Sequence, residues 1–307
     1  MISRLINTVS RRLTGGSETH LFGIRSNLLE RFSRILKRDR KAQVGLSIVA
    51  VVSLIAIFAP VIAPYDPMSQ NFPVMQPPTF TGAHPLGTDS FGRDLLSRVV
   101  FGARLSLAVG LSAVAFGTLI GVPMGLYAGY YGGWVDDLLM RMVDTMWAFP
   151  ALLIAILAVA IHGQSIWVPI FAIGFALIDD FARITRGEVL SIREEEYTLA
   201  AESIGMGKFK IMFEEILPNA VAPILVQYTV STARAILTEA TLSFLGIGVK
   251  ITTPTWGSLL RQGRGFIQQA WWISIIPGLI IMITVLGINL FGDALRDAFD
   301  VKESGGT

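Results

Sequence analysis

The feature of this sequence that most limits its fold is a series of apolar runs, each long enough to cross a lipid bilayer. The hydrocarbon core of a bilayer is about 30 Å thick and needs about 20 apolar residues per helix. Only 16% of the 307 residues are charged, whereas about 25% is usual in a soluble domain. The sequence therefore predicts an all-α integral membrane protein with six transmembrane helices. Their expected ranges are 44–64, 105–135, 138–161, 166–184, 219–246 and 270–292.

Several classes of site are disfavoured by the residues present. The chain has no cysteine, which excludes a disulfide framework, a thiolate zinc site and an iron–sulfur cluster. Its histidines, His20, His84 and His162, lie in different regions without metal-ligand spacing. Gly207-Lys208 lacks the Ser or Thr that follows the lysine of a Walker A loop. We therefore expect no metal, no cofactor, no ATP binding and no enzyme activity on this chain.

The distribution of basic residues predicts the orientation and the segments of the chain. Short cytoplasmic loops carry an excess of Lys and Arg, and residues 1–43 hold ten of them. We expect both termini on the cytoplasmic side of the plasma membrane. We expect no nucleic-acid partner, since anionic lipid accounts for the basic cluster. The apolar spacing within residues 21–36 predicts an amphipathic helix on the cytoplasmic membrane surface, or a solvated helix packed on protein. The expected segments are a cytoplasmic part at 1–43, a first span with an extracytoplasmic segment at 44–104, a five-helix core at 105–293 and a cytoplasmic tail at 294–307.

The loop at residues 186–218 is expected on the cytoplasmic side. Its pattern predicts a helix over residues 197–204, a turn at Gly205 and Gly207, and a second helix over residues 208–217 that ends before Pro218. Small side chains beside a glycine turn allow a partner backbone to come close. Such a hairpin suits insertion into a groove of a partner protein, although a loop that only links two spans remains the alternative.

This loop resembles the EAA loop of bacterial and archaeal ABC-importer permeases. Ala200 and Ala201 fill the two alanine positions, Gly205 fills the glycine position, and Leu217-Pro218 forms the end of the pattern. Two positions depart from it. Leu199 replaces the glutamate, and Ile216 comes one residue late.

Other stretches resemble the dipeptide/oligopeptide/nickel permease family, in particular its C-type transmembrane subunit. They include His84-Pro-Leu-Gly-Thr-Asp89, Ser243-Phe-Leu-Gly246, Pro254-Thr-Trp256-Gly257 and Gly292-Asp-Ala-Leu-Arg-Asp297. The resemblance implies a type I ABC-importer (MetI-like) permease fold. It also implies a homologous B-type permease, two ABC ATPase subunits that carry ATP and Mg, and an extracytoplasmic substrate-binding protein. Di- or oligopeptides are the expected substrates, and nickel or oligosaccharides stay open.

Three groups of candidate site residues follow. The resemblance implies that the first group contacts the ATPase: Tyr197, Ala200, Ala201, Gly205, Ile216, Leu217 and Pro218. Ionisable residues at membrane depth tend to face protein or water, and they form the second group, at the pathway or a subunit interface: Arg234, Glu239, Asp144, Asp179, Asp180 and Arg183. The third group lies in the segments expected to face the binding protein: Asp89, Arg93, Asp94 and Trp256.

Some of these charges have a purely structural alternative, as ion pairs. We expect Arg141 to meet Asp144, and Arg183 to meet Asp179 or Asp180, because these residues lie three or four positions apart. Arg234 and Glu239 lie deeper, in the span at 219–246, and we expect them at the pathway or at a permease–permease interface. The glycines flanking Pro123, Gly121 and Gly125, suggest close helix packing or a kink.

Two other functions are less compatible with the sequence. A proton- or ion-coupled transporter would use Asp144, Asp179, Asp180 and Glu239 as a relay, but the sequence shows no inverted repeat. A membrane enzyme, such as an intramembrane protease, lacks a catalytic set in the sequence. The docking loop favours the importer subunit over both.

Overall fold

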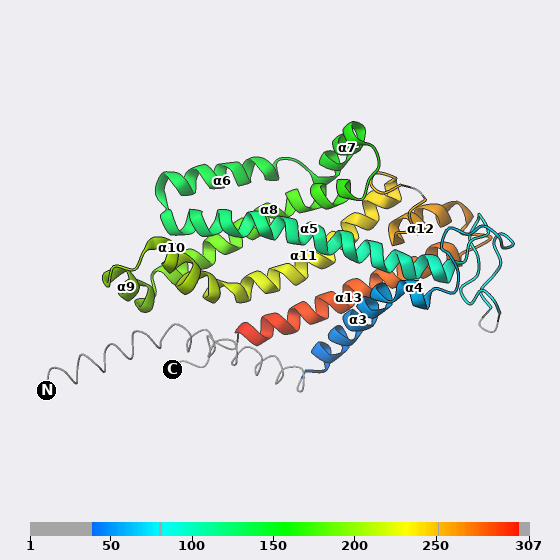
Figure 1. The fold of residues 1–307 in the computed structure, drawn as a ribbon, viewed down its shortest axis with the longest axis horizontal. Helices are drawn as coiled ribbons and strands as arrows, with labels where there is room; N and C mark the ends of the chain where they lie inside the picture. Colours follow the sequence, from blue (N-terminus) through cyan, green and yellow to red (C-terminus); the bar gives the residue numbers. More distant parts are fainter. Residues whose placement is uncertain (1–38, 80–81, 251, 301–307) are drawn as a thin grey trace.

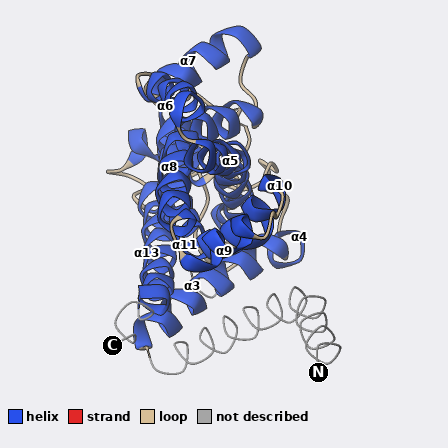
Figure 2. Cartoon of the chain, turned by 90° about the vertical axis from the view of Figure 1, so that its left-hand side faces the viewer, coloured by secondary structure: helices blue, strands red, loops and turns tan. Residues whose placement is uncertain are grey.

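The computed structural model describes residues 39–79, 82–250 and 252–300, and its regular structure there is helical (Figures 1 and 2). The surface helix expected within residues 21–36 lies outside the described residues. Five long helices run along the length of the molecule: α3 (Arg40–Ile57), α5 (Leu95–Tyr131), α8 (Trp167–Arg193), α11 (Leu217–Leu245) and α13 (Trp272–Asp300). Shorter elements connect them: α4 (Ala59–Ile62), α6 (Gly133–Trp147), α7 (Ala151–His162), α9 (Glu196–Ser203), α10 (Lys208–Lys210), the π-helix η1 (Ile211–Ile216), α12 (Trp256–Gly263) and the 3₁₀-helix η2 (Arg264–Phe266).

Within the described ranges, four helices are long and apolar enough to cross a membrane: α3, α5, α13 and the continuous helix over residues 208–245 that contains α11. A fifth span arises if the bent pair α6 and α7 is counted as one. The expected sixth, α8, is 27 residues long but carries Asp179, Asp180 and Arg183 in its middle, which lowers its hydropathy. The all-helical fold is confirmed, while the count of six spans stays a prediction.

The prediction of a single helix over residues 138–161 is wrong. The chain forms α6 and α7 instead, bent by 76° across a short break. Pro150 lies in that break as the N-cap of α7, and proline disfavours helical geometry at the residue before it. The break therefore follows from Pro150, although the residues around this proline form one apolar run.

Helix α5 begins at Leu95, ten residues before the start expected at 105. The Asp94 carboxylate caps the first turn by accepting a hydrogen bond from the Ser97 backbone N–H. Arg98 falls inside the helix and is fully buried by the segment around it. The charged start of this helix is thus covered by protein, which the apolar pattern alone does not reveal.

The expectation of close packing around Gly121 and Gly125 is confirmed. Gly117, Gly121, Gly125 and Gly129 of α5 all lie against α8, and a Cβ on Gly121 would come within 2.6 Å of the Ile178 carbonyl oxygen. Small residues let two helix backbones approach closely in this way. Helices α5 and α8 consequently form one tightly packed pair.

The two ends of the molecule carry different structures. At one end α9 and α10 form a hairpin between α8 and α11, and at the other end α12 lies beside the proline-rich segment at residues 65–94 (Figure 1). The pair α5 and α8 and the neighbouring α11 connect these ends. This arrangement places the two groups of candidate contact residues at opposite ends of the helical bundle.

Candidate functional site

The hairpin at residues 196–218 begins with α9, which ends just before a turn at Gly205. Gly205 has φ +80°, a left-handed geometry that glycine adopts without a steric penalty. On α9 the side chains of Thr198 and Ala201 are buried, while Tyr197 and Ala200 are exposed. The predicted helix and turn are therefore present, and of the two alanines expected at an ATPase contact, Ala200 is exposed while Ala201 is buried.

The predicted end of the second helix before Pro218 is wrong. The chain passes from α10 through η1 into α11 without a break, and Pro218 occupies the first turn of α11. Proline is tolerated there because its missing N–H needs no partner in the first helical turn. Ile216 is fully buried and Leu217 is half-buried, so these residues join the hairpin to α11.

The hairpin presents several large apolar side chains to solvent. Ile204 is 73% exposed and Phe209 is 64% exposed, and the Phe209 ring lies 4.4 Å from that of Phe213. We call the exposed set the hairpin patch: Tyr197, Leu199, Ile204, Phe209 and Phe213. Partial burial raises the pKa of the Tyr197 phenol above its ordinary value. Large apolar side chains exposed on one hairpin favour an interaction surface there.

A second feature is a set of ion pairs between α6 and α8. Arg183 contacts Asp179 on its own helix, as expected, and also Asp144 on α6 at 2.6 Å. The expected pairing of Asp144 with Arg141 is therefore replaced by a pair across two helices. The side chains of Arg183 and Asp144 are each at least half exposed.

Arg234 and Glu239, the deeper charges of the span expected at 219–246, lie in different surroundings. Arg234 on α11 contacts Asp180 on α8 at 2.7 Å, and its side chain is 60% exposed. Asp180 and Arg234 together with Asp144 and Arg183 form what we call the charged face.

Glu239 is fully buried within this chain, so it faces neither a pathway nor a partner. Its carboxylate accepts hydrogen bonds from Ser106 of α5 at 3.0 Å and from Ser243 of its own helix at 2.7 Å. Ser106 also accepts a hydrogen bond from the Trp256 backbone N–H. Glu239 thus joins α5, α11 and the start of α12. The sequence analysis did not select Ser106 as a site residue.

The candidates at the other end of the molecule are buried as well. Asp89, Arg93, Asp94 and Trp256 are each at most 5% exposed. The Trp256 indole donates to the Val99 carbonyl at 3.1 Å. A partner docked here would contact the surrounding loops, because these four side chains point into the protein.

These buried polar residues form two networks around the start of α5. In the first, Asp89 contacts Arg93 at 2.7 Å and Arg98 at 3.4 Å, and it accepts from Gln262 of α12. In the second, His84 contacts Asp94 at 2.9 Å. Arg98 and Gln262, which the sequence interpretation did not select as site residues, tie the proline-rich segment to α5 and α12.

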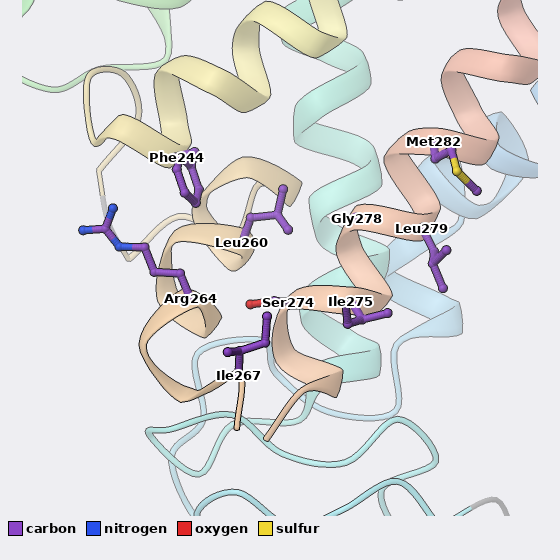
Figure 3. Close-up of a pocket in the computed structure, with 9 residues that line it drawn as sticks. All are labelled: Phe244, Leu260, Arg264, Ile267, Ser274, Ile275, Gly278, Leu279 and Met282. Carbon is purple, nitrogen blue, oxygen red and sulfur yellow. The ribbon is translucent and has the colours of Figure 1, made fainter. Parts of the chain in front are cut away.

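The pocket of about 440 Å³ in Figure 3 lies between the end of α11, α12, η2 and the first half of α13. The Arg264 guanidinium lies 5.5 Å from the Phe244 ring centre. The remaining lining is almost entirely apolar: Leu260, Ile267, Ser274, Ile275, Gly278, Leu279 and Met282. Such a lining offers few groups that would orient a polar solute.

Across the described part of the chain, no group of three or more His, Asp or Glu side chains is arranged to hold a metal ion. The arrangement instead combines a helical hairpin with exposed apolar side chains at one end, a charged face along the helices and a buried polar network at the other end. This combination defines a helical membrane protein that works with partner proteins.

The fold resembles that of a solved ABC importer. The structure titled "Inward facing conformations of the MetNI methionine ABC transporter" matches with a TM-score of 0.56 at 18% sequence identity. The match covers 66% of this chain and 97% of that chain. At this identity the likeness establishes the fold alone, and it confirms the expected type I ABC-importer permease fold.

The sequence comparisons define the family more closely. The family described as "Binding-protein-dependent transport system inner membrane component" matches residues 121–304, and the "N-terminal TM domain of oligopeptide transport permease C" matches residues 27–78. The chain belongs to this family of importer inner membrane components, as a C-type permease.

Relatives named "Dipeptide transport system permease protein DppC" align over most of the chain. The protein from Alkalihalophilus pseudofirmus is 46% identical over 87% of this chain and 88% of its own length. That from Escherichia coli is 46% identical over 89% of this chain and 93% of its own length. The Haemophilus influenzae protein is 41% identical over 93% of this chain and 99% of its own length.

Proposed function

We propose that this chain is the transmembrane permease subunit of an ATP-driven, binding-protein-dependent importer of di- or oligopeptides. The names of relatives that are 41–46% identical support peptides as the substrate class. The observation that carries the proposal is the hairpin patch, an exposed apolar surface on a helical hairpin that is continuous with α11. Exposed apolar side chains of this kind favour an interaction site, and we assign it to a protein partner.

In this proposal the hairpin docks on a cytoplasmic ATPase. Tyr197, Ala200 and Gly205 lie on its exposed side, where small residues permit close approach of the ATPase backbone. Ala201 and Ile216 are buried and fix the hairpin against the bundle, while Leu217 and Pro218 begin α11. Movement of the ATPase pair then displaces the hairpin and α11 together.

The charged face is proposed to line the translocation pathway. An ionised side chain facing lipid near the middle of a span costs about 2.5–3.5 kcal/mol on insertion scales. Arg234 and Asp180 pair with each other, yet the Arg234 side chain stays largely exposed in the isolated chain. A water-filled pathway shared with a homologous B-type permease relieves this cost. Arg183, with its partners Asp179 and Asp144, continues the same lining.

The orientation and the partners complete the proposal. Both termini and the hairpin lie in the cytoplasm, and the proline-rich segment and α12 receive an extracytoplasmic binding protein. ATP and Mg belong to two partner ATPases, so this chain is a permease and not an enzyme.

Co-purification from membranes tests the proposed assembly. A tag on the C-terminus should bring down a second permease and ATPases that carry Walker A motifs. As a matched comparison, Phe209→Asp places a charge in the hairpin patch and should remove the ATPases while retaining the second permease. Recovery of the wild-type chain alone, or as a homo-oligomer, would contradict the proposal.

A further inference from the structure

Helix α5 reaches from one end of the molecule to the other. Its 37 residues span about 55 Å at 1.5 Å per residue. Asp94 caps the first turn and contacts His84 of the proline-rich segment. The last turn ends at Tyr130 and Tyr131, beside the hairpin, and the glycine contacts described above hold the helix against α8.

Tyr130 is the first of two tyrosines that connect this last turn to the hairpin. It is 4% exposed, and its hydroxyl donates to the Glu202 carboxylate of α9 at 3.3 Å. Arg193 at the end of α8 donates to the Tyr130 carbonyl at 2.9 Å, and its guanidinium lies 5.9 Å from the Tyr130 ring centre. Tyr130 thus joins the ends of α5 and α8 to the first arm of the hairpin.

Tyr131 contacts the second arm of the hairpin, which begins with α10. The Lys208 ammonium at the start of α10 lies 5.5 Å from the Tyr131 ring centre, within cation–π range. The Tyr127 ring stacks on Tyr131 at 6.0 Å from one turn earlier in α5. Glu202 and Lys208 lie on opposite sides of the Gly205 turn. The adjacent residues Tyr130 and Tyr131 therefore contact both arms of the hairpin, α9 and α10.

We infer that Tyr130 and Tyr131 form a clamp that makes the hairpin and α5 move together, so that they act as positioning residues for coupling. This inference rests on the proposed function, in which an ATPase docks on the hairpin. The hairpin already continues directly into α11, and the clamp adds a second connection through α5. Because α5 carries the polar network at its first turn, displacement of the hairpin reaches the segment proposed to receive the binding protein.

The test uses the whole importer in proteoliposomes and measures peptide transported per ATP hydrolysed. The double variant Tyr130→Phe with Tyr131→Leu removes the hydrogen bond to Glu202, the cation–π contact with Lys208 and the ring contacts of Tyr131 with Tyr127 and Tyr130. The ratio should then fall about tenfold. ATPase co-purification should stay at the wild-type level. Tyr127→Phe removes a hydroxyl from the same face and keeps its ring, so it is the matched control and should keep the ratio.

Three further variants separate the clamp from a direct ATPase contact of Glu202. Glu202→Gln retains an acceptor oxygen and should keep the ratio, whereas Glu202→Ala should lower it. Tyr130→Phe combined with Glu202→Ala should be no worse than either single change, since both remove the same bond.

Additive effects, or a wild-type ratio in the tyrosine double variant, would overturn the clamp. Failure of the wild-type importer to transport peptide with ATP would instead overturn the proposed function.

Discussion

The Ser106 hydroxyl on α5 donates a hydrogen bond of 3.0 Å to the Glu239 carboxylate on α11, although 133 residues separate the two. The same hydroxyl accepts a hydrogen bond from the Trp256 backbone at the start of α12. Glu239 is fully buried. Its role in this structure is to hold three helices at one point.

Removal of this acceptor should destabilise the protein. Glu239→Leu leaves the buried hydroxyls of Ser106 and Ser243 without their carboxylate partner, at about 1–3 kcal/mol for each unsatisfied group. Glu239→Gln retains an acceptor oxygen, so its loss of stability should be much smaller. Thermal unfolding of the purified protein in detergent checks this prediction, and equal midpoints for wild type and the leucine variant would contradict it.

The Gly205 turn should be sensitive to any side chain. At φ +80° an L-residue costs about 1–2 kcal/mol, so Gly205→Ala should distort the hairpin and lower binding-protein-stimulated ATP hydrolysis in the assembled importer. Gly207 is the matched control, because its φ is −63° and a Cβ added there would meet no atom within 4 Å. Normal stimulation in Gly205→Ala, or equal loss in both variants, would argue against a role for the turn geometry.

The ion pair between Asp180 and Arg234 should matter for transport more than for stability. Exposed ion pairs contribute about 0–1 kcal/mol, so Arg234→Gln should unfold close to the wild-type temperature. Peptide uptake should fall, since the proposed pathway loses one of its two arginines. Uptake and unfolding measured on the same preparation check this. A large drop in the unfolding temperature with normal uptake per folded importer would make the pair structural.

The contact between α5 and α8 should not accept a larger residue at Gly121. A Cβ there meets the Ile178 carbonyl oxygen at 2.6 Å, and overpacking of this kind costs about 1–3 kcal/mol. Gly121→Val should therefore lower the unfolding temperature and the yield of folded protein. Gly187→Ala on α8 meets no atom within 4 Å and serves as the control. A valine variant as stable as the control would refute the close approach.

Local signals in the sequence predicted the hairpin well. The helix around Ala200 and the turn at Gly205 depend on nearby residues, and both are present. The junction at Pro218 was missed because a proline that ends one helix also fits the first turn of the next. The break before α7 was missed because the apolar run continues through Pro150.

The pairing of charges could not be predicted from spacing. Asp144 and Arg183 are 39 residues apart, and Asp180 and Arg234 are 54 apart, so their meeting depends on how α6, α8 and α11 pack. The burial of polar side chains could not be predicted from the sequence either. A sequence motif shows that Asp89 is present, but only the folded chain shows it enclosed by Arg93 and Arg98.

Peptide uptake by the purified complex in proteoliposomes is the sharpest test of the importer proposal. The assembly of this chain with its second permease, two ATPases and binding protein should accumulate a labelled dipeptide only when ATP is supplied on the ATPase side. Omission of the binding protein or the ATPases should abolish uptake. Uptake by this chain alone, driven by a proton or sodium gradient without ATP, would contradict the proposal and establish a secondary transporter.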